Sequence, residues 1–276
     1  MSLRYSDEQR LLADSARDFL AARSPVSAQR RLRDEAVAFG FEPQLWREAV
    51  ELGWSAIPFP EDFGGLDFGC KGLGPIFESI GRNLSATPLL SSVVLGGSMV
   101  LLAGSPAQQT RWLQAVIGGE QRLALAVDER SRHNPSHIAL AAKADGQGYC
   151  LHGDKFWVID GLGADAYVVA ARTSGQPGDT QGISLFLVPA DSPGVTVSAL
   201  GLIDSRNSAR LRLDEVRVGS DALLGNLDEG WAVLETALDR GRTCLAAELL
   251  GMAEQLFETT LEYLKTRVQF DTPIGT

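Results

Sequence analysis

The sequence predicts an α+β multidomain protein, with an N-terminal all-α domain, a central antiparallel β-domain and the start of a C-terminal helical bundle. Apolar residues recur at the spacing of amphipathic helices in the first and last parts of the chain. Between them, short strand-like runs alternate with glycine, proline and aspartate turns. We therefore expect domain boundaries at residues 1–121, 122–225 and 226–276.

Capping signals mark where the N-terminal helices begin. The segment SDEQ has the form of a capping box, which predicts an amphipathic helix over residues 6–23. Pro43 suits the first position of a second helix, and Gly53 suits its end. The segment 57–65 contains two prolines and two glycines and is expected to be an ordered loop. Further helices are expected at residues 72–82, 88–103 and 105–116.

The central region has the turn-forming residues between short apolar runs that are typical of a β-domain. Gly153-Asp154 is expected to form a tight turn between two strands, because glycine reaches positive φ without a Cβ clash. After Gly225 the helical pattern returns in two amphipathic segments, the second ending at about Thr266. The predicted strands lie at residues 123–127, 138–144, 149–152, 155–159, 166–172, 183–188, 195–199 and 209–218.

Composition excludes several classes of function. The net charge of −10 argues against binding to nucleic acid or to an anionic membrane surface. No apolar run reaches the ~18 residues of a membrane span, and the N-terminus lacks a signal peptide. The cysteines Cys70, Cys150 and Cys244 are too few and too far apart for a disulfide framework or a zinc site. We therefore expect a cytoplasmic protein without membrane insertion.

The sequence carries few general catalytic motifs. It has no nucleophile elbow and no phosphate-binding G-x-x-x-x-G-K-[ST] loop. Gly161-Leu162-Gly163 lacks the third glycine of a Rossmann fingerprint. His133 and His137 have helical spacing, but Pro135 disfavours a helix between them, so we predict no metal site. A nucleotide cofactor, if one binds, is held in another way.

Four sequence blocks resemble the acyl-CoA dehydrogenases. The blocks are SDEQRLLADSARDFL at 6–20, LWREAVELGWSAIPFPEDFGG at 45–65, GDKFWVIDGLGADAYVVAAR at 153–172 and RVQFDTPIG at 267–275. Members of this flavoenzyme family have an N-terminal helical domain, a central β-domain and a C-terminal four-helix domain. The resemblance covers the whole sequence, whereas most of the family's C-terminal helical domain is absent from it.

The resemblance implies an FAD cofactor between the β-domain and the C-terminal helices, with its nucleotide tail reaching a neighbouring subunit. Trp157 matches the aromatic that packs against the flavin ring, and Arg267 matches an arginine that contacts the partner's cofactor. A core tryptophan and a helix-terminal surface charge are the alternative interpretations of these two residues. The implied cofactor-binding residues are Leu125, Ala126, Val127, Trp157, Val158, Ile159, Arg267, Gln269 and Phe270.

The sequence also departs from the family pattern. Where the family carries hydroxyl residues that bond the flavin, this chain has Val127 and Ile159. The departures resemble small subunits of pimeloyl-CoA-type dehydrogenases and related heteromeric enzymes of dicarboxylate or steroid side-chain breakdown. Arg130, Arg132 and His133 are candidates to meet CoA phosphates or a distal carboxylate, or else they form an exposed polar loop.

The family reaction needs a carboxylate base, and none is identifiable in the sequence. A minority of members place it at the position of Gly241, where glycine cannot act. The neighbouring Arg242 matches the family arginine near the CoA moiety. We expect either a chain that lacks its last ~100 residues or a subunit that does not catalyse alone.

The leading hypothesis is an acyl-CoA dehydrogenase subunit that passes electrons to an electron-transferring flavoprotein. It would work within a homo- or hetero-oligomer, a dimer of dimers. One alternative is a non-catalytic structural subunit of a heteromeric enzyme. Another is a flavin monooxygenase of the same fold.

Overall fold

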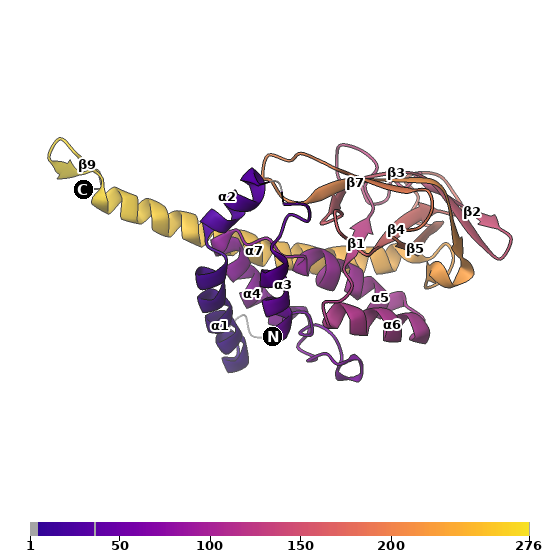
Figure 1. Cartoon of the computed structure of the whole chain (residues 1–276), viewed down its shortest axis with the longest axis horizontal. Helices are drawn as coiled ribbons and strands as arrows, with labels where there is room; N and C mark the ends of the chain where they lie inside the picture. Colours follow the sequence, from indigo (N-terminus) through magenta and orange to yellow (C-terminus); the bar gives the residue numbers. More distant parts are fainter. Residues whose placement is uncertain (1–4, 36, 276) are drawn as a thin grey trace.

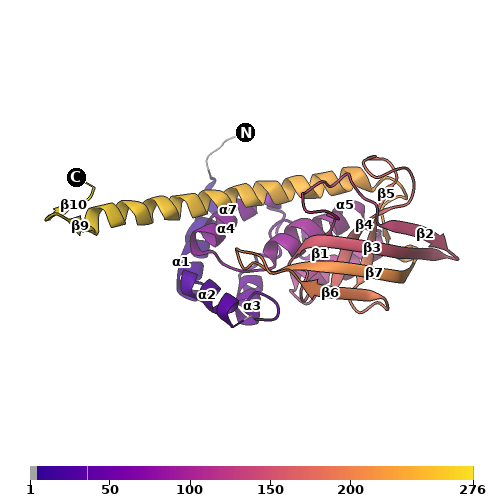
Figure 2. The same ribbon diagram turned by 90° about the horizontal axis from the view of Figure 1, so that it is seen from above.

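A computed structural model of the chain describes residues 5–35 and 37–275, so the predicted domain limits at Met1 and Thr276 lie outside the described residues. The N-terminal helices and the β-sheet lie side by side, and helix α7 (Gly230–Thr266) runs along both and projects beyond them (Figures 1 and 2). The other helical elements are α1 (Asp7–Arg23), α2 (Val26–Asp34), α3 (Pro43–Glu51), η1 (Glu61–Phe63), α4 (Gly69–Asn83), η2 (Leu89–Gly97), α5 (Ser98–Ala103), α6 (Pro106–Ile117) and η3 (Ser220–Ala222). The strands are β1 (Leu123–Ala126), β2 (Ala141–Asp145), β3 (Gly148–Ile159), β4 (Ala166–Arg172), β5 (Ile183–Pro189), β6 (Val195–Ala199), β7 (Ser208–Gly219), β8 (Leu223–Leu224), β9 (Val268–Gln269) and β10 (Thr272–Pro273).

The N-terminal helices begin where their sequence signals place them. The Ser6 hydroxyl accepts a hydrogen bond from the Gln9 amide at 3.2 Å, and the Ser6 amide donates to the Gln9 side chain at 3.0 Å. This confirms the capping box of α1. The apolar helix expected at 88–103 is also present and mostly buried, but its first part, η2, winds as a π-helix before α5 continues it.

Most strand pairs of the sheet are antiparallel, as the sequence predicts, but the sheet also includes parallel pairs. Its strand order is β6-β7-β3-β2-β4-β5-β8, with β1 paired to β4. β1 runs parallel to β4, with Leu125 opposite Val168, whereas β2–β3, β3–β7 and β4–β5 are antiparallel. Strand β2 also meets β4 in parallel, at Ala141 and Arg172. The residues between β1 and β4, which include the β2–β3 hairpin, provide the crossover connection that parallel strands need.

Strand β3 is continuous, so the tight turn predicted at Gly153-Asp154 is wrong. The pairing of β3 with β7 shifts register between Leu151 and Gly153, which marks a β-bulge. Gly153 has a φ of +145°, and a Cβ there would lie 2.9 Å from Cγ of Leu140. Glycine therefore serves a bulge in a long strand. A second register shift, between Lys155 and Val158, precedes the end of β3.

Helix α7 is one helix of 37 residues, whereas the sequence pattern predicted two segments. Gly251 lies where α7 crosses α4, and a Cβ at this position would be 1.9 Å from the backbone oxygen of Glu78. The glycine permits a close helix crossing and does not end the helix. Among the described residues, no helix has a long enough apolar window to cross a bilayer.

Two hydrophobic cores hold the fold together. The larger joins the helices to one side of the sheet, and the smaller lies among the strands. Strand β1 contributes to both, because its residues alternate between the two sides: Leu125 packs in the larger core and Ala126 in the smaller. Val127, directly after β1, also packs in the larger core.

Candidate functional site

A cavity of about 570 Å³ opens where the helices meet the end of β3. Helices α4 and α7, strand β3 and the segment 202–208 surround it, with Gln29 of α2 at its margin. This volume is within the range of pockets that bind small molecules. Its apolar lining includes Phe77, Ile80, Leu84, Leu90, Trp157, Ile159, Leu202, Leu245 and Met252.

Trp157 and Ile159 present an apolar wall to this cavity. Trp157 adopts the left-handed backbone conformation, with a φ of +57°, within the second register shift of β3. Its indole Nε1 donates to the backbone oxygen of Arg130 at 2.8 Å, which fixes the ring. The two side chains are 38% and 40% exposed, so Trp157 is not a core tryptophan in the described chain.

A buried ion pair connects β3, the strand that carries Trp157 and Ile159, to the segment after β1. Lys155 is fully buried, and its Nζ donates to Glu129 Oε1 at 2.6 Å and to the backbone oxygen of Val127 at 2.9 Å. The Glu129 carboxylate also accepts from the backbone amides of Ala139 and Leu140. Burial lowers the pKa of Lys155 to about 8, while the charge of Glu129 acts in the opposite direction. The pair therefore ties β3 to the segment that follows β1.

The cavity also has a polar side, formed by Asp160, Arg206 and Glu248, which sequence reasoning missed. Asp160 accepts a hydrogen bond from the Ser91 hydroxyl at 2.7 Å, and Arg206 pairs with Glu248. Glu248 is only 7% exposed, and it lies on α7 seven residues after Gly241. The helical spacing from Gly241 is the one signal in the sequence that points to Glu248.

Burial raises the pKa of Asp160 from its ordinary value of 3.8 to about 6, although the Ser91 hydrogen bond and Arg206 oppose this shift. Between these two values the folded protein holds a proton that the unfolded chain releases. The contribution of Asp160 to stability is thus present below pH 3.8 and is lost as the pH rises through about 6.

This predicts a specific difference from the Asp160→Asn variant. The free energy of unfolding of the wild type should fall relative to that of the variant as the pH rises from about 4 to 6. Urea denaturation of both proteins across this range measures the difference. A flat difference would show that folding leaves the pKa of Asp160 unshifted, and a difference that grows in favour of the wild type would show that folding lowers it; either result contradicts the prediction.

The predicted substrate-binding residues lie outside the cavity itself. His133 is exposed, and its Nδ1 lies 2.8 Å from Oδ2 of Asp128, a residue that does line the cavity. Arg132 is exposed on the same loop. Arg242 lies on the surface of α7 with its guanidinium 2.5 Å from Asp239. These positions suit contact with a ligand at the cavity mouth or on the outer surface.

Gly241 is buried in α7 beside η2. A Cβ at this position would lie 2.8 Å from Cδ2 of Leu95. A carboxylate at this position would therefore require Leu95 to move. As a glycine, this residue has no side chain that could remove a proton from a substrate.

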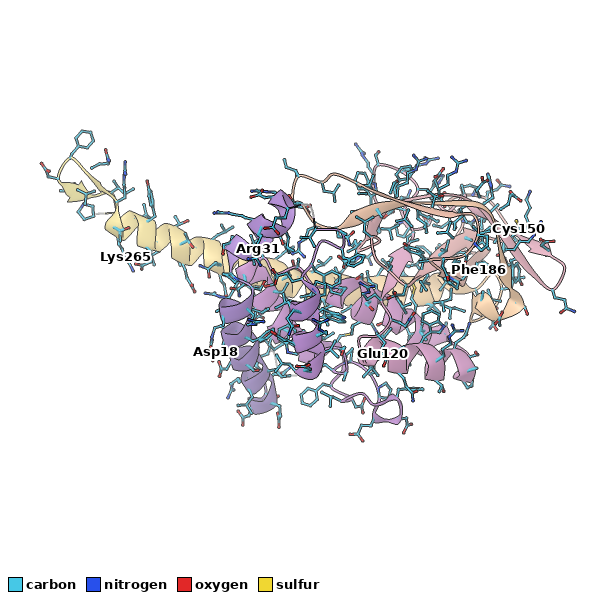
Figure 3. All side chains as sticks on the ribbon, in the orientation of Figure 1. Asp18, Arg31, Glu120, Cys150, Phe186 and Lys265 are labelled. Carbon is cyan, nitrogen blue, oxygen red and sulfur yellow. The ribbon has the colours of Figure 1, made fainter. Side chains whose placement is uncertain are left out.

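The terminal block is far from Trp157 within this chain. Arg267, Gln269 and Phe270 belong to the β9–β10 hairpin region at the projecting end of α7, near Lys265 in Figure 3. Phe270 is 98% exposed. A surface aromatic at the end of a projecting helix is suited to contact another molecule.

The residues of the cavity fit a flavin ring in part. The exposed faces of Trp157 and Ile159 suit packing against a planar ring. Val127 is 5% exposed and Leu125 is 7% exposed, so this strand can offer a ligand little besides its backbone. Neither Val127 nor Ile159 has a side-chain donor. Within residues 5–35 and 37–275, no group of three or more His, Cys, Asp or Glu residues is placed to hold a metal.

Comparisons with known proteins match this architecture throughout. Residues 6–120, 128–216 and 228–276 match the models of the N-terminal, middle and C-terminal domains of acyl-CoA dehydrogenases. Acyl-CoA dehydrogenase FadE27 of Mycobacterium tuberculosis is 33% identical over 85% of this chain and 59% of its own. An acyl-CoA dehydrogenase of Bacillus subtilis is 30% identical over 99% of this chain and 72% of its own.

A similar solved structure is the ChsE4–ChsE5 complex of Mycobacterium tuberculosis. It superposes with a TM-score of 0.86 at 29% identity, covering 100% of this chain and 71% of the matched chain. The chain belongs to the acyl-CoA dehydrogenase family. It spans 59% of the length of FadE27 and 63% of that of a second mycobacterial relative, FadE12.

Proposed function

We propose that this chain provides the acyl-binding cavity and a flavin-packing wall of an FAD-dependent acyl-CoA dehydrogenase. The reaction would remove a proton from Cα and a hydride from Cβ of a CoA thioester, with electrons leaving to an electron-transferring flavoprotein. The observation that carries this proposal is the cavity between α4, β3 and α7, in which the exposed faces of Trp157 and Ile159 meet further apolar side chains from α4 and α7 beside a polar side.

FAD, when bound, would supply the acceptor for the hydride. The chain's own contribution is to shape and support the site. The Lys155–Glu129 pair fixes the strand that carries Trp157, and the hydrogen bond from its indole to Arg130 fixes the ring. The apolar lining excludes water from the acyl group, which strengthens the electrostatic interactions made there. Arg242 is an exposed cation available to the CoA moiety.

The base would come from a residue outside those described, in this protein or in a partner subunit. Val127, Ile159 and Gly241 together favour a second candidate function, that of a structural subunit whose active site is completed by a related chain. Similarity to a chain of the ChsE4–ChsE5 complex supports assembly with a partner. The exposed terminal residues Arg267, Gln269 and Phe270 would then contact the cofactor of the neighbouring subunit.

The test uses the full-length protein, purified alone and together with a related acyl-CoA dehydrogenase subunit. Each preparation is incubated with CoA thioesters and an electron acceptor, and the products are analysed by mass spectrometry. The expected product has lost two hydrogens and carries an α,β double bond. If the full-length protein alone forms this product, the structural-subunit candidate is wrong. If neither preparation binds flavin or forms the product, the proposed function is wrong.

A further inference from the structure

The polar side of the cavity contains hydrogen-bonding groups that the protein does not satisfy. Asp160 Oδ2 accepts from Ser91, but within the described residues no donor reaches Oδ1. Arg206 uses one guanidinium nitrogen for Glu248 and leaves the others without a side-chain acceptor in the described chain. The side-chain oxygen of Gln29 is inaccessible to solvent and has no hydrogen-bond partner. Asp160, Arg206, Glu248 and Gln29 all line the same cavity.

Of these atoms only the Gln29 oxygen is both inaccessible and unpartnered, which is costly because a buried acceptor without a donor loses its hydration and gains nothing in return. The free oxygen of Asp160 and the free nitrogens of Arg206 keep access to solvent, so a ligand in the cavity can reach them. The balance here is toward acceptors, since Asp160, Glu248 and Gln29 all present oxygen atoms. A ligand that brings a donor would relieve this, and a ligand that brings only acceptors would not. The remaining N–H groups of Arg206 can in turn donate to an oxygen of the ligand.

A hydroxyl group meets both requirements. It can donate to the Asp160 carboxylate and accept from the Arg206 guanidinium, whereas an ammonium cannot accept and a carboxylate cannot donate. A ligand carboxylate would also face the negative charges of Asp160 and Glu248, with Arg206 already paired to Glu248. The apolar side chains of the cavity, from Phe77 and Ile80 of α4 to Leu245 and Met252 of α7, suit hydrocarbon.

We infer that the cavity selects CoA thioesters whose acyl group is a hydrocarbon bearing a hydroxyl group remote from the thioester, with Asp160 as the specificity-determining residue. This inference rests on the proposed function, which places the acyl group in this cavity. The inference also predicts that substrates with a distal carboxylate, which Arg130, Arg132 and His133 were considered to bind, are disfavoured. Ser91 acts as a positioning residue, because its hydroxyl holds the Asp160 carboxylate.

The experiment measures binding directly, by titration calorimetry on the full-length protein with its FAD and any partner subunit it requires. Three series of straight-chain CoA thioesters are compared at matched lengths: unsubstituted, terminally hydroxylated and terminally carboxylated. At one or more lengths, we expect the hydroxylated thioester to bind at least about tenfold more tightly than its unsubstituted counterpart. The carboxylated series should bind more weakly than both.

Three variants test which residues produce the preference for the hydroxylated thioester. Asp160→Asn should remove most of the preference for the hydroxyl, and Gln29→Leu should raise the affinity for the unsubstituted series. Asp145→Asn is the control, since Asp145 lies in β2, is not among the cavity-lining residues and has its carboxylate paired with Arg217. It should leave the preference unchanged. Gln29→Leu removes no hydrogen bond of the described structure, so it tests the inference even if Asp160→Asn fails to fold.

The outcomes distinguish failure of the inferred hydroxyl selectivity from failure of the proposed dehydrogenase function. Equal binding of the hydroxylated and unsubstituted series, or tighter binding of the carboxylated series, overturns the selectivity while the dehydrogenase function stands. A preference that survives both Asp160→Asn and Gln29→Leu overturns the assignment to this side of the cavity. Failure of every CoA thioester to bind overturns the proposed function and the inference with it.

Discussion

Replacing Gly251 with alanine is expected to lower the free energy of unfolding by about 2–3 kcal/mol, because it overpacks a helix crossing. The new Cβ would lie 1.9 Å from the backbone oxygen of Glu78, a distance that no side-chain adjustment can relieve. The contact is reciprocal, since a Cβ at Gly81 of α4 would lie 1.9 Å from the backbone oxygen of Glu248. Helices α4 and α7 would have to separate, and the cavity between them would change shape.

Urea denaturation monitored by circular dichroism measures this effect. Gly118→Ala is the control, because Gly118 has an ordinary helical backbone at the end of α6 and its nearest neighbour to a new Cβ lies 3.4 Å away. Its stability should stay close to that of the wild type. A Gly251→Ala protein as stable as the Gly118→Ala protein would mean that α4 and α7 do not cross this closely.

Replacing Lys155 with methionine is expected to destabilise the protein by about 3–5 kcal/mol, the usual consequence of removing one partner of a buried ion pair. Methionine fills similar space, so the effect arises mainly from charge. Glu129 would keep its hydrogen bonds to Ala139 and Leu140 but would lose its cation in a site where only 10% of its side chain is exposed. The wall that carries Trp157 would lose its support.

The matched control is Lys265→Met, which breaks an ion pair of similar length to Glu262 on the exposed surface of α7. Exposed pairs contribute little to stability, so this variant should unfold close to the wild type. Equal stability of the two variants would contradict the structural role assigned to Lys155. Fluorescence of Trp157 provides a second readout, because its surroundings should change in Lys155→Met and not in Lys265→Met.

Local signals made much of the fold predictable. The capping box at Ser6 and Gln9, the proline at the start of α3 and the alternation of short apolar runs in the centre each act over a few residues. The errors arose where one local signal fits two structures. Gly153-Asp154 suits a turn or a bulge, and the neighbouring strand β7 decides between them. The two amphipathic segments predicted after Gly225 form one helix, because their separate apolar stripes pack against different neighbours along a single α7.

The candidate site was less predictable than the fold. Trp157 and Ile159 could be singled out because they belong to a continuous sequence block that resembles a known family. The polar side of the cavity has no such block. Ser91, Asp160, Arg206 and Glu248 come from η2, the end of β3, the loop before β7 and α7, and only the tertiary fold brings them together. Their residue types are common in loops and helices, so their spacing carries no signal beyond the helical spacing of Glu248 from Gly241.

The proposed dehydrogenation is tested most directly by adding a CoA thioester to the full-length, FAD-containing protein in the absence of oxygen, together with its partner subunit if one is required. The account predicts that the visible absorbance of oxidised flavin bleaches as the thioester is added, with one flavin reduced for each thioester oxidised. The absorbance should return when electron-transferring flavoprotein is supplied. Flavin that stays oxidised in the presence of every thioester that binds would contradict the account.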